Sequence, residues 1–138
     1  MLTCDQFNQG GAGKLPGHLG IVITQASAEA IHGEIAVQPC HMAPNGYLHA
    51  GTIVTLADTC AGYGCMTNLP KGASGFTTIE LKSNHLGTAL EGTIESVTKP
   101  VHTGRTTQVW DSIVTHRETG KTLALFRCTQ LILYPKSS

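Results

Sequence analysis

The sequence has 138 residues, of which 41% are apolar and only 13% are charged. Nine basic residues balance nine acidic ones, so the formal net charge is zero. The length favours a single folded domain, and the neutral balance argues against a protein that binds nucleic acid through its phosphates. The charged fraction is well below the usual value of about 25%. We therefore expect part of the surface to be covered, most simply in a homo-oligomer.

The first residues, 1–17, are polar and rich in glycine, and we expect them to form a flexible arm with one short helical turn. They contain no apolar segment of the kind that a signal peptide needs. No apolar run approaches the length of about 18 residues that spans a membrane. The five cysteines include no CxxC pair, which favours reduced, mostly buried thiols in a cytoplasmic protein.

Two short β-branched segments, 19–26 and 29–37, are separated by a tight link and predict a β-hairpin. Residues 38–48 contain two prolines and an Asn-Gly pair, so we expect a loop. In residues 49–67, apolar and small side chains recur at the spacing of one helical face. This spacing predicts a long helix, and its many small residues predict that other elements enclose it closely.

The sequence after Gly72 reads as β-structure to its end. Strands are predicted near 75–81, 90–97, 106–116 and 123–133. One long helix beside a mostly antiparallel sheet of five to six strands is an α+β fold, with the sheet wrapped around the helix. We take residues 18–138 as one domain that follows the arm.

Asp58 lies in the middle of the predicted helix, more than two turns from its start, with Val54, Ala61 and Cys65 as helical neighbours. It is too far from the start to cap the helix or to gain from its dipole. A carboxylate beside apolar and small side chains is costly unless it is paired or used in chemistry. A solvated position or a structural hydrogen bond and a catalytic role are both compatible with this pattern.

His49 and Ala50 lie at the start of the same helix, where backbone N–H groups have no partner within the helix. Such groups suit a carbonyl oxygen or an oxyanion, and Gly46 and Gly51 leave room for its approach. A capping histidine is the alternative interpretation of His49. The helical rise separates His49 from Asp58 by roughly 13 Å. Both residues can therefore act on one substrate only where two copies of the chain meet.

The stretch from Asn45 to Asp58 resembles the signature of the hotdog-fold acyl-CoA thioesterases, in the PaaI-like branch of phenylacetic acid degradation. That family has His-Gly-Gly at the helix start and an acidic residue nine positions after the histidine. Here His49, Ala50, Gly51 and Asp58 stand at these positions, and Ala50 still supplies a backbone N–H. The resemblance covers about residues 18–134. It implies the hotdog fold and a homodimer or homotetramer whose active site is shared between subunits.

The resemblance also implies the hydrolysis of an acyl-CoA or aryl-CoA thioester without a metal, and with no cofactor apart from the coenzyme A of the substrate. Asp58 would be the nucleophile or the general base, and the N–H of Ala50 would bind the oxyanion. Thr78 stands where the family often has Ser or Thr near the attacking water. Predicted substrate-binding residues are Asn45, Gly46, Gly51, Asn84, Gly104 and Arg105.

Two departures from the family pattern concern the substrate. Many members carry Asn or Gln at the position of Ala43, for which Asn45 is a candidate substitute, and relatives often have Arg-Pro at the position of Gly87-Thr88. Two other functions stay open at this point. One is a hotdog module that binds acyl-CoA without turnover, and the other is a hotdog enoyl-CoA hydratase or dehydratase. Cys40, His41 and His49 lack the paired spacing of a zinc site.

Overall fold

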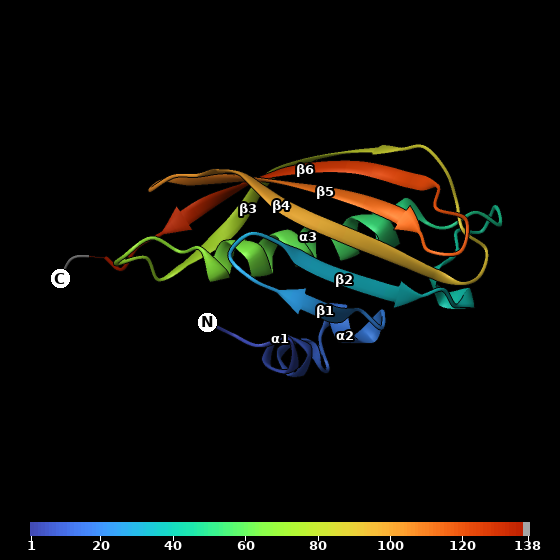
Figure 1. Ribbon diagram of the computed structural model, residues 1–138, viewed down its shortest axis with the longest axis horizontal. Coiled ribbons are helices and arrows are strands. Elements are labelled where there is room, and N and C mark those ends of the chain that lie inside the picture. The colour runs from blue at the N-terminus through green and yellow to red at the C-terminus, as the bar shows by residue number, and fades with distance from the viewer. Residues whose placement is uncertain (137–138) are drawn as a thin grey trace.

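A six-stranded antiparallel sheet curves around helix α3, which runs from Ala50 to Thr67 (Figure 1). The structure is a computed structural model that describes residues 1–136. The sheet order is β1-β2-β4-β5-β6-β3, and every neighbouring pair is antiparallel. The strands are β1 (Val22–Ala26), β2 (Ile31–Ala36), β3 (Gly75–His85), β4 (Thr93–Thr103), β5 (Thr107–His116) and β6 (Thr122–Leu133). The predicted α+β arrangement of one helix and a wrapped sheet is confirmed.

Strand β4 is longer than the predicted strand near 90–97. Pro100 lies within this strand although proline cannot donate a hydrogen bond to a neighbouring strand. The structure accommodates Pro100 at an irregularity, where the pairing with β5 shifts between Pro100 and His102. The ladder therefore continues past the proline to Thr103.

The small residues of α3 allow the helix to lie close against the sheet. A Cβ atom on Gly64 would come within 2.5 Å of the ring of the buried Trp110, and one on Gly62 within 2.9 Å of the ring of Phe76. Cys60 and Cys65 are also fully buried. The predicted close enclosure of this helix is confirmed, and it fixes the position of α3 relative to the strands.

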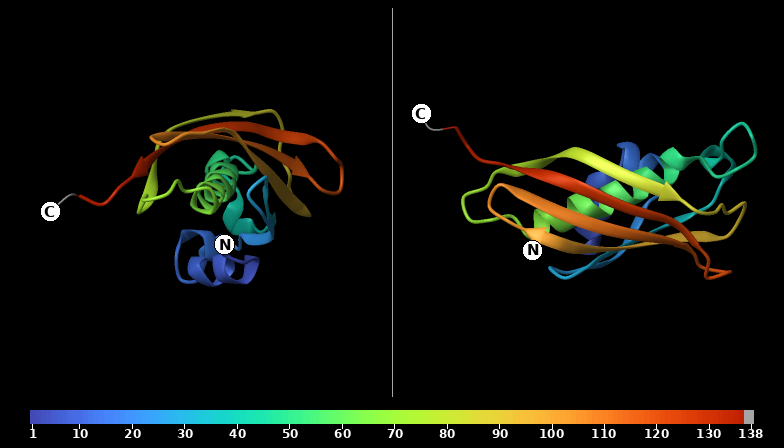
Figure 2. Two further views of the ribbon diagram at one scale, coloured as in Figure 1. Left: turned by 60° about the vertical axis from the view of Figure 1, so that its left-hand side comes forward. Right: turned by 90° about the horizontal axis from the view of Figure 1, so that it is seen from above.

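Residues at the N-terminus form helices α1 (Cys4–Gly11) and α2 (Leu15–His18). They lie on the side of α3 opposite strands β5 and β6 of the sheet (Figure 2). Thr3 and Gln6 form a capping box at the start of α1. Phe7 is buried and stacks on Tyr63 of α3, with ring centroids 4.3 Å apart. The expected flexible arm is therefore corrected: most of it is helical and packed. No helix in residues 1–136 has the length and apolar character needed to cross a membrane.

The two edges of the sheet differ. At the β1 edge, the side-chain amide of Asn8 binds both backbone groups of Ile23, so helix α1 occupies the free side of that strand. At the β3 edge, strand pairing within residues 1–136 is formed with β6 alone. Ile79 and Leu81 of β3 are 54% and 42% exposed. The β3 edge is therefore available to a further strand.

Candidate active site

Asp58 lies on the side of α3 that faces strand β3. The hydroxyl of Thr78 donates a hydrogen bond to its Oδ1 atom at 3.1 Å. Burial raises the pKa of the Asp58 carboxyl above its ordinary value, and the hydrogen bond from Thr78 lowers it in part. The structure thus brings together two of the residues to which catalysis was assigned from the sequence. A partly buried carboxylate with a perturbed pKa is suited to act as a base or nucleophile.

His49 caps the N-terminus of α3. Its Nδ1 atom accepts a hydrogen bond from the backbone N–H of Gly51 at 2.8 Å. In the neutral ring the proton is then on Nε2, which leaves that nitrogen as a donor. A Cβ atom on Gly51 would lie 2.9 Å from Nδ1, so the absence of a side chain at Gly51 allows this cap. In residues 1–136 the N–H of Ala50 has no hydrogen-bond partner.

The loop before His49 is shaped by Asn45 and Gly46. The side-chain oxygen of Asn45 accepts a hydrogen bond from the N–H of Tyr47 at 3.2 Å, and Gly46 adopts a φ of +87° that side-chain-bearing residues rarely adopt. The N–H of Leu48 donates to the hydroxyl of Thr88 at 2.9 Å. Asn45 and Gly46 therefore have a role in loop conformation, and Thr88 anchors the segment that leads to His49.

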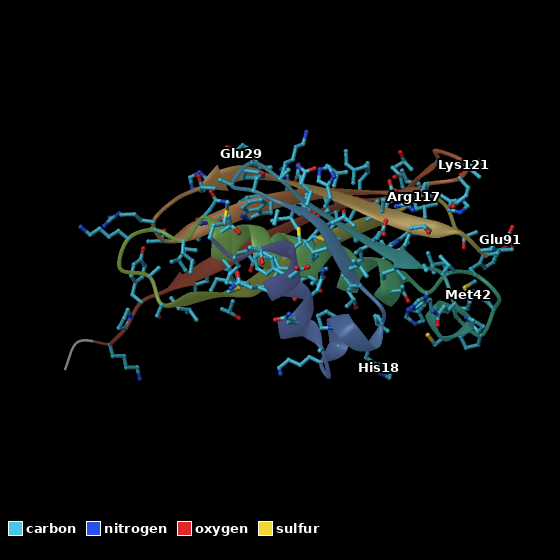
Figure 3. All side chains as sticks on the ribbon, turned by 60° about the horizontal axis from the view of Figure 1, so that its bottom comes forward. His18, Glu29, Met42, Glu91, Arg117 and Lys121 are labelled. Carbon is cyan, nitrogen blue, oxygen red and sulfur yellow. The ribbon has the colours of Figure 1, made fainter. Side chains whose placement is uncertain are left out.

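The helix start and the Asp58–Thr78 pair lie apart along α3 within one chain. Met42, which pairs with Leu48 just before His49, lies at the end of the molecule that carries Glu91 and Lys121 (Figure 3). The predicted substrate residues Gly104 and Arg105 lie at the opposite end, in the turn between β4 and β5 (Figure 1). The structure therefore does not bring His49, Asp58 and Arg105 together within a single chain.

Asn84 lies on the outer face of the sheet. It lines a depression there together with Lys82 of β3 and the ion-paired Asp111 and Arg127 of β5 and β6. Thr78 lies on the inner face, where it meets Asp58. Within one chain the structure thus separates Asn84 from the Asp58–Thr78 pair, and the role of Asn84 in substrate binding stays a prediction.

Residues 45–123 match the Thioesterase superfamily. This chain belongs to that superfamily. A 1,4-dihydroxy-2-naphthoyl-CoA hydrolase of Escherichia coli is 31% identical over 135 residues, which cover 96% of each chain. A hydrolase of the same name from Listeria monocytogenes is 36% identical over 86 residues, or 62% of this chain and 68% of that one.

The fold agrees with this assignment. A crystal structure of a thioesterase from Haemophilus influenzae superposes with a TM-score of 0.90 at 27% sequence identity, and the match covers 97% of this chain and 92% of that one. The fold is the hotdog fold that the resemblance implied, and the chain is a thioesterase. The roles of the individual site residues stay predictions.

One buried polar residue beside the candidate site was missed from the sequence. Gln130 of β6 is fully buried, and its side-chain amide lies 2.8 Å from the hydroxyl of Thr78. The available signal was a glutamine at an inward position of an alternating strand, between Cys128 and Ile132. Such a position normally holds an apolar side chain.

Proposed function

We propose that this chain hydrolyses the thioester bond of an aryl-CoA or acyl-CoA, in active sites that two copies of the chain build together. Asp58 and Thr78 come from one subunit, and the partner's Ala50 supplies the N–H for the carbonyl oxygen. The observation that carries the proposal is the position of the Asp58–Thr78 pair. The pair lies at β3, whose outer edge has no strand beside it in residues 1–136, and it is separated along α3 from the N–H of Ala50.

A shared site would follow from the pairing of two β3 edges. An antiparallel pair of identical strands is related by a twofold axis, so the partner's elements run in the opposite direction. The partner's helix start then comes toward the middle of this subunit's α3, where Asp58 meets Thr78 of β3. The exposed Ile79 and Leu81 would be covered by this contact. The low charged fraction of the sequence fits a protein with such a covered surface.

The proposed chemistry follows from the groups that the two subunits bring to this interface. The partner's Ala50 N–H, at the positive end of a helix dipole, would stabilise the negative charge that develops on the thioester oxygen. The Asp58 carboxylate would attack the carbonyl carbon or remove a proton from an attacking water. In both routes the C–S bond breaks, the sulfur leaves as coenzyme A with one proton of the water, and the acyl carbon keeps the hydroxyl of that water as a carboxylic acid. When Asp58 is the nucleophile, this water hydrolyses the anhydride between Asp58 and the acyl group.

The turn that contains Arg105 supports coenzyme A as the leaving group. It lies at the end of the sheet where α3 ends, and the twofold arrangement would place it near the partner's helix start (Figure 1). The backbone oxygen of Arg105 accepts a hydrogen bond from Tyr134, which holds the turn. The guanidinium remains suited to a phosphate group. The names of the relatives from Escherichia coli and Listeria monocytogenes favour an aromatic acyl group.

The same proposal includes three finer assignments. The spacing from His49 to Asp58 supports the PaaI-like branch. A homotetramer would form from two of the dimers described above, since the outer face of the sheet exposes Ile113 and Leu125. A cytoplasmic location is supported by the free, mostly buried cysteines.

The test is a panel of CoA thioesters that includes 1,4-dihydroxy-2-naphthoyl-CoA, benzoyl-CoA, a straight-chain acyl-CoA and an enoyl-CoA, assayed for the release of free thiol. Cys40 is exposed, so its reaction with the thiol reagent is subtracted with a sample that lacks substrate. We expect thiol release, fastest with an aromatic thioester, and a loss of about 10²–10⁴-fold in Asp58→Asn. Tight binding without thiol release, or hydration of the enoyl group alone, would contradict the proposal.

A further inference from the structure

Gln130 connects the candidate catalytic pair to a buried thiol. Thr78 and Gln130 are direct cross-strand partners of β3 and β6. The structure places the Oε1 atom of Gln130 2.8 Å from the hydroxyl of Thr78 and its Nε2 atom 3.5 Å from the sulfur of Cys128. The hydroxyl of Thr78 lies 3.1 Å from Asp58. Four polar side chains therefore form one continuous chain of hydrogen bonds.

The number of protons limits this chain of hydrogen bonds to two directions, and the protonation of Asp58 decides between them. A hydroxyl group has one proton, so Thr78 cannot donate to Asp58 and to a side-chain oxygen of Gln130 at the same time. The two ends of a glutamine amide have the same shape, and the neighbouring groups decide which end faces which partner. When Thr78 donates to an ionised Asp58, Gln130 must present its NH₂ group to Thr78, which exchanges the two ends of the amide relative to their placement in the structure.

The contact between Gln130 and Cys128 is consistent with this orientation of the amide. With its NH₂ group toward Thr78, Gln130 presents its oxygen to Cys128. Burial raises the pKa of Cys128 to about 12, so this thiol keeps its proton and can donate it. Each group then donates to the next, from Cys128 through Gln130 and Thr78 to Asp58. With a protonated Asp58, which would itself donate to Thr78, the amide would have the reverse orientation.

We propose that Gln130 is a positioning residue, which holds the hydroxyl of Thr78 as a donor to Asp58 and so favours the ionised carboxylate. This inference rests on the proposed function of Asp58, and it adds a residue that does not touch the substrate. Without Gln130, the hydroxyl is free to rotate away from Asp58. The carboxylate then loses its donor and takes up a proton at a higher pH.

The kinetic test compares the pH dependence of kcat/KM in the wild type, Gln130→Met, Thr78→Val and the double variant. We expect the acid limb of the Gln130→Met profile to move to higher pH. On that limb kcat/KM should fall by about tenfold more than it falls at the plateau, which is the effect expected for the loss of one hydrogen bond to a charged group. In the Thr78→Val background, Gln130→Met should cause no further movement, because its effect passes through Thr78.

A matched control is available in Gln108, a second fully buried glutamine, which binds Trp110 and the backbone of Asn68. Gln108→Met should lower thermal stability without moving the acid limb. A uniform loss of activity at all pH values in Gln130→Met, or an equal movement of the limb in both glutamine variants, would overturn the positioning role.

A second measurement uses the wild-type protein and needs no activity. The side-chain NH₂ resonances of Gln130 are followed by ¹⁵N NMR during an acid titration. We expect them to shift together with the carboxyl resonance of Asp58, and to stay constant over the same range in Asp58→Asn. Resonances of Gln130 that do not respond to the titration of Asp58 would refute the inference. This result is distinct from a failure of the proposed function, which would appear as a wild type that hydrolyses no CoA thioester.

Discussion

The side chain of Asn8 satisfies both backbone groups of Ile23, since its Oδ1 accepts from the N–H at 2.7 Å and its Nδ2 donates to the oxygen at 3.1 Å. An edge strand whose backbone groups are bound in this way cannot add a further strand at that point. The opposite edge, β3, has no such cover in residues 1–136. The sheet is therefore open to pairing at the edge next to Asp58 and closed at the other.

A charge on the open edge should separate the subunits. In Ile79→Asp, the dimer would bury an unpaired carboxylate, which costs about 3–5 kcal/mol and weakens association more than a hundredfold. Sedimentation should show a shift toward monomer, and activity should fall with the dimer fraction. The control is Val22→Asp on β1, where the wild-type side chain is 46% exposed. A fully active monomer of Ile79→Asp would contradict the shared site.

Ala50→Pro removes the N–H that we assign to the oxyanion while it preserves the helix. Proline is well tolerated at the first helical position, and His49 already has the extended φ of −65° and ψ of 131° that a residue before proline prefers. We expect kcat to fall by about 10²–10³-fold, as for the loss of one oxyanion donor. The melting temperature should change little, and Ala50→Gly, which keeps the N–H, should retain most of the activity.

The raised pKa of Asp58 also predicts how stability changes with pH. A carboxyl whose pKa is raised on folding binds its proton more tightly in the folded state, so stability falls as pH rises from the ordinary value of 3.8 through the folded pKa. Asp58→Asn removes this ionisation. Its melting temperature should exceed that of the wild type at neutral pH, and the difference should shrink toward pH 3. A variant that is less stable at neutral pH would indicate that the carboxylate stabilises the fold.

The packing of α3 against Trp110 predicts the effect of a single methyl group. Gly64→Ala gains helix propensity of about 1 kcal/mol, but the new Cβ would lie 2.5 Å from a fully buried ring. Overpacking costs about 1–3 kcal/mol, so we expect net destabilisation in a urea titration. Gly10 of α1 has no atom within 4 Å of an added Cβ, and Gly10→Ala should be neutral or stabilising. Equal effects of the two substitutions would contradict this account of the small residues.

The long helix and the sheet were predictable because their signals are local. The apolar face of residues 49–67 and the alternation of the strands need no knowledge of tertiary contacts. The helix α1 also has a local signal, the capping box of Thr3 and Gln6, but the many glycines around it obscured that signal. What holds α1 in place is the contact of Phe7 with Tyr63, which only the tertiary structure shows.

The position of Asn84 on the outer face of the sheet has one physical cause. From Thr78, strict alternation would place Asn84 on the same inner face of β3. The pairing with β6 shifts between Thr78 and Glu80, so Ile79 is an extra residue in the strand. Such a bulge reverses the side on which every later side chain lies. The sequence pattern contains no mark of this bulge, and the pairing of Thr78 with Gln130 was equally hidden from it.

Mixing two inactive variants tests the shared site most directly. In a dimer of one Asp58→Asn chain and one Ala50→Pro chain, one site has both defects and the other has an intact Asp58 opposite an intact Ala50. After the chains are refolded together in equal amounts, half of the dimers should be mixed, and we predict about one quarter of wild-type activity. Activity no higher than the mean of the two separate variants would show that Asp58 and Ala50 do not meet across two subunits.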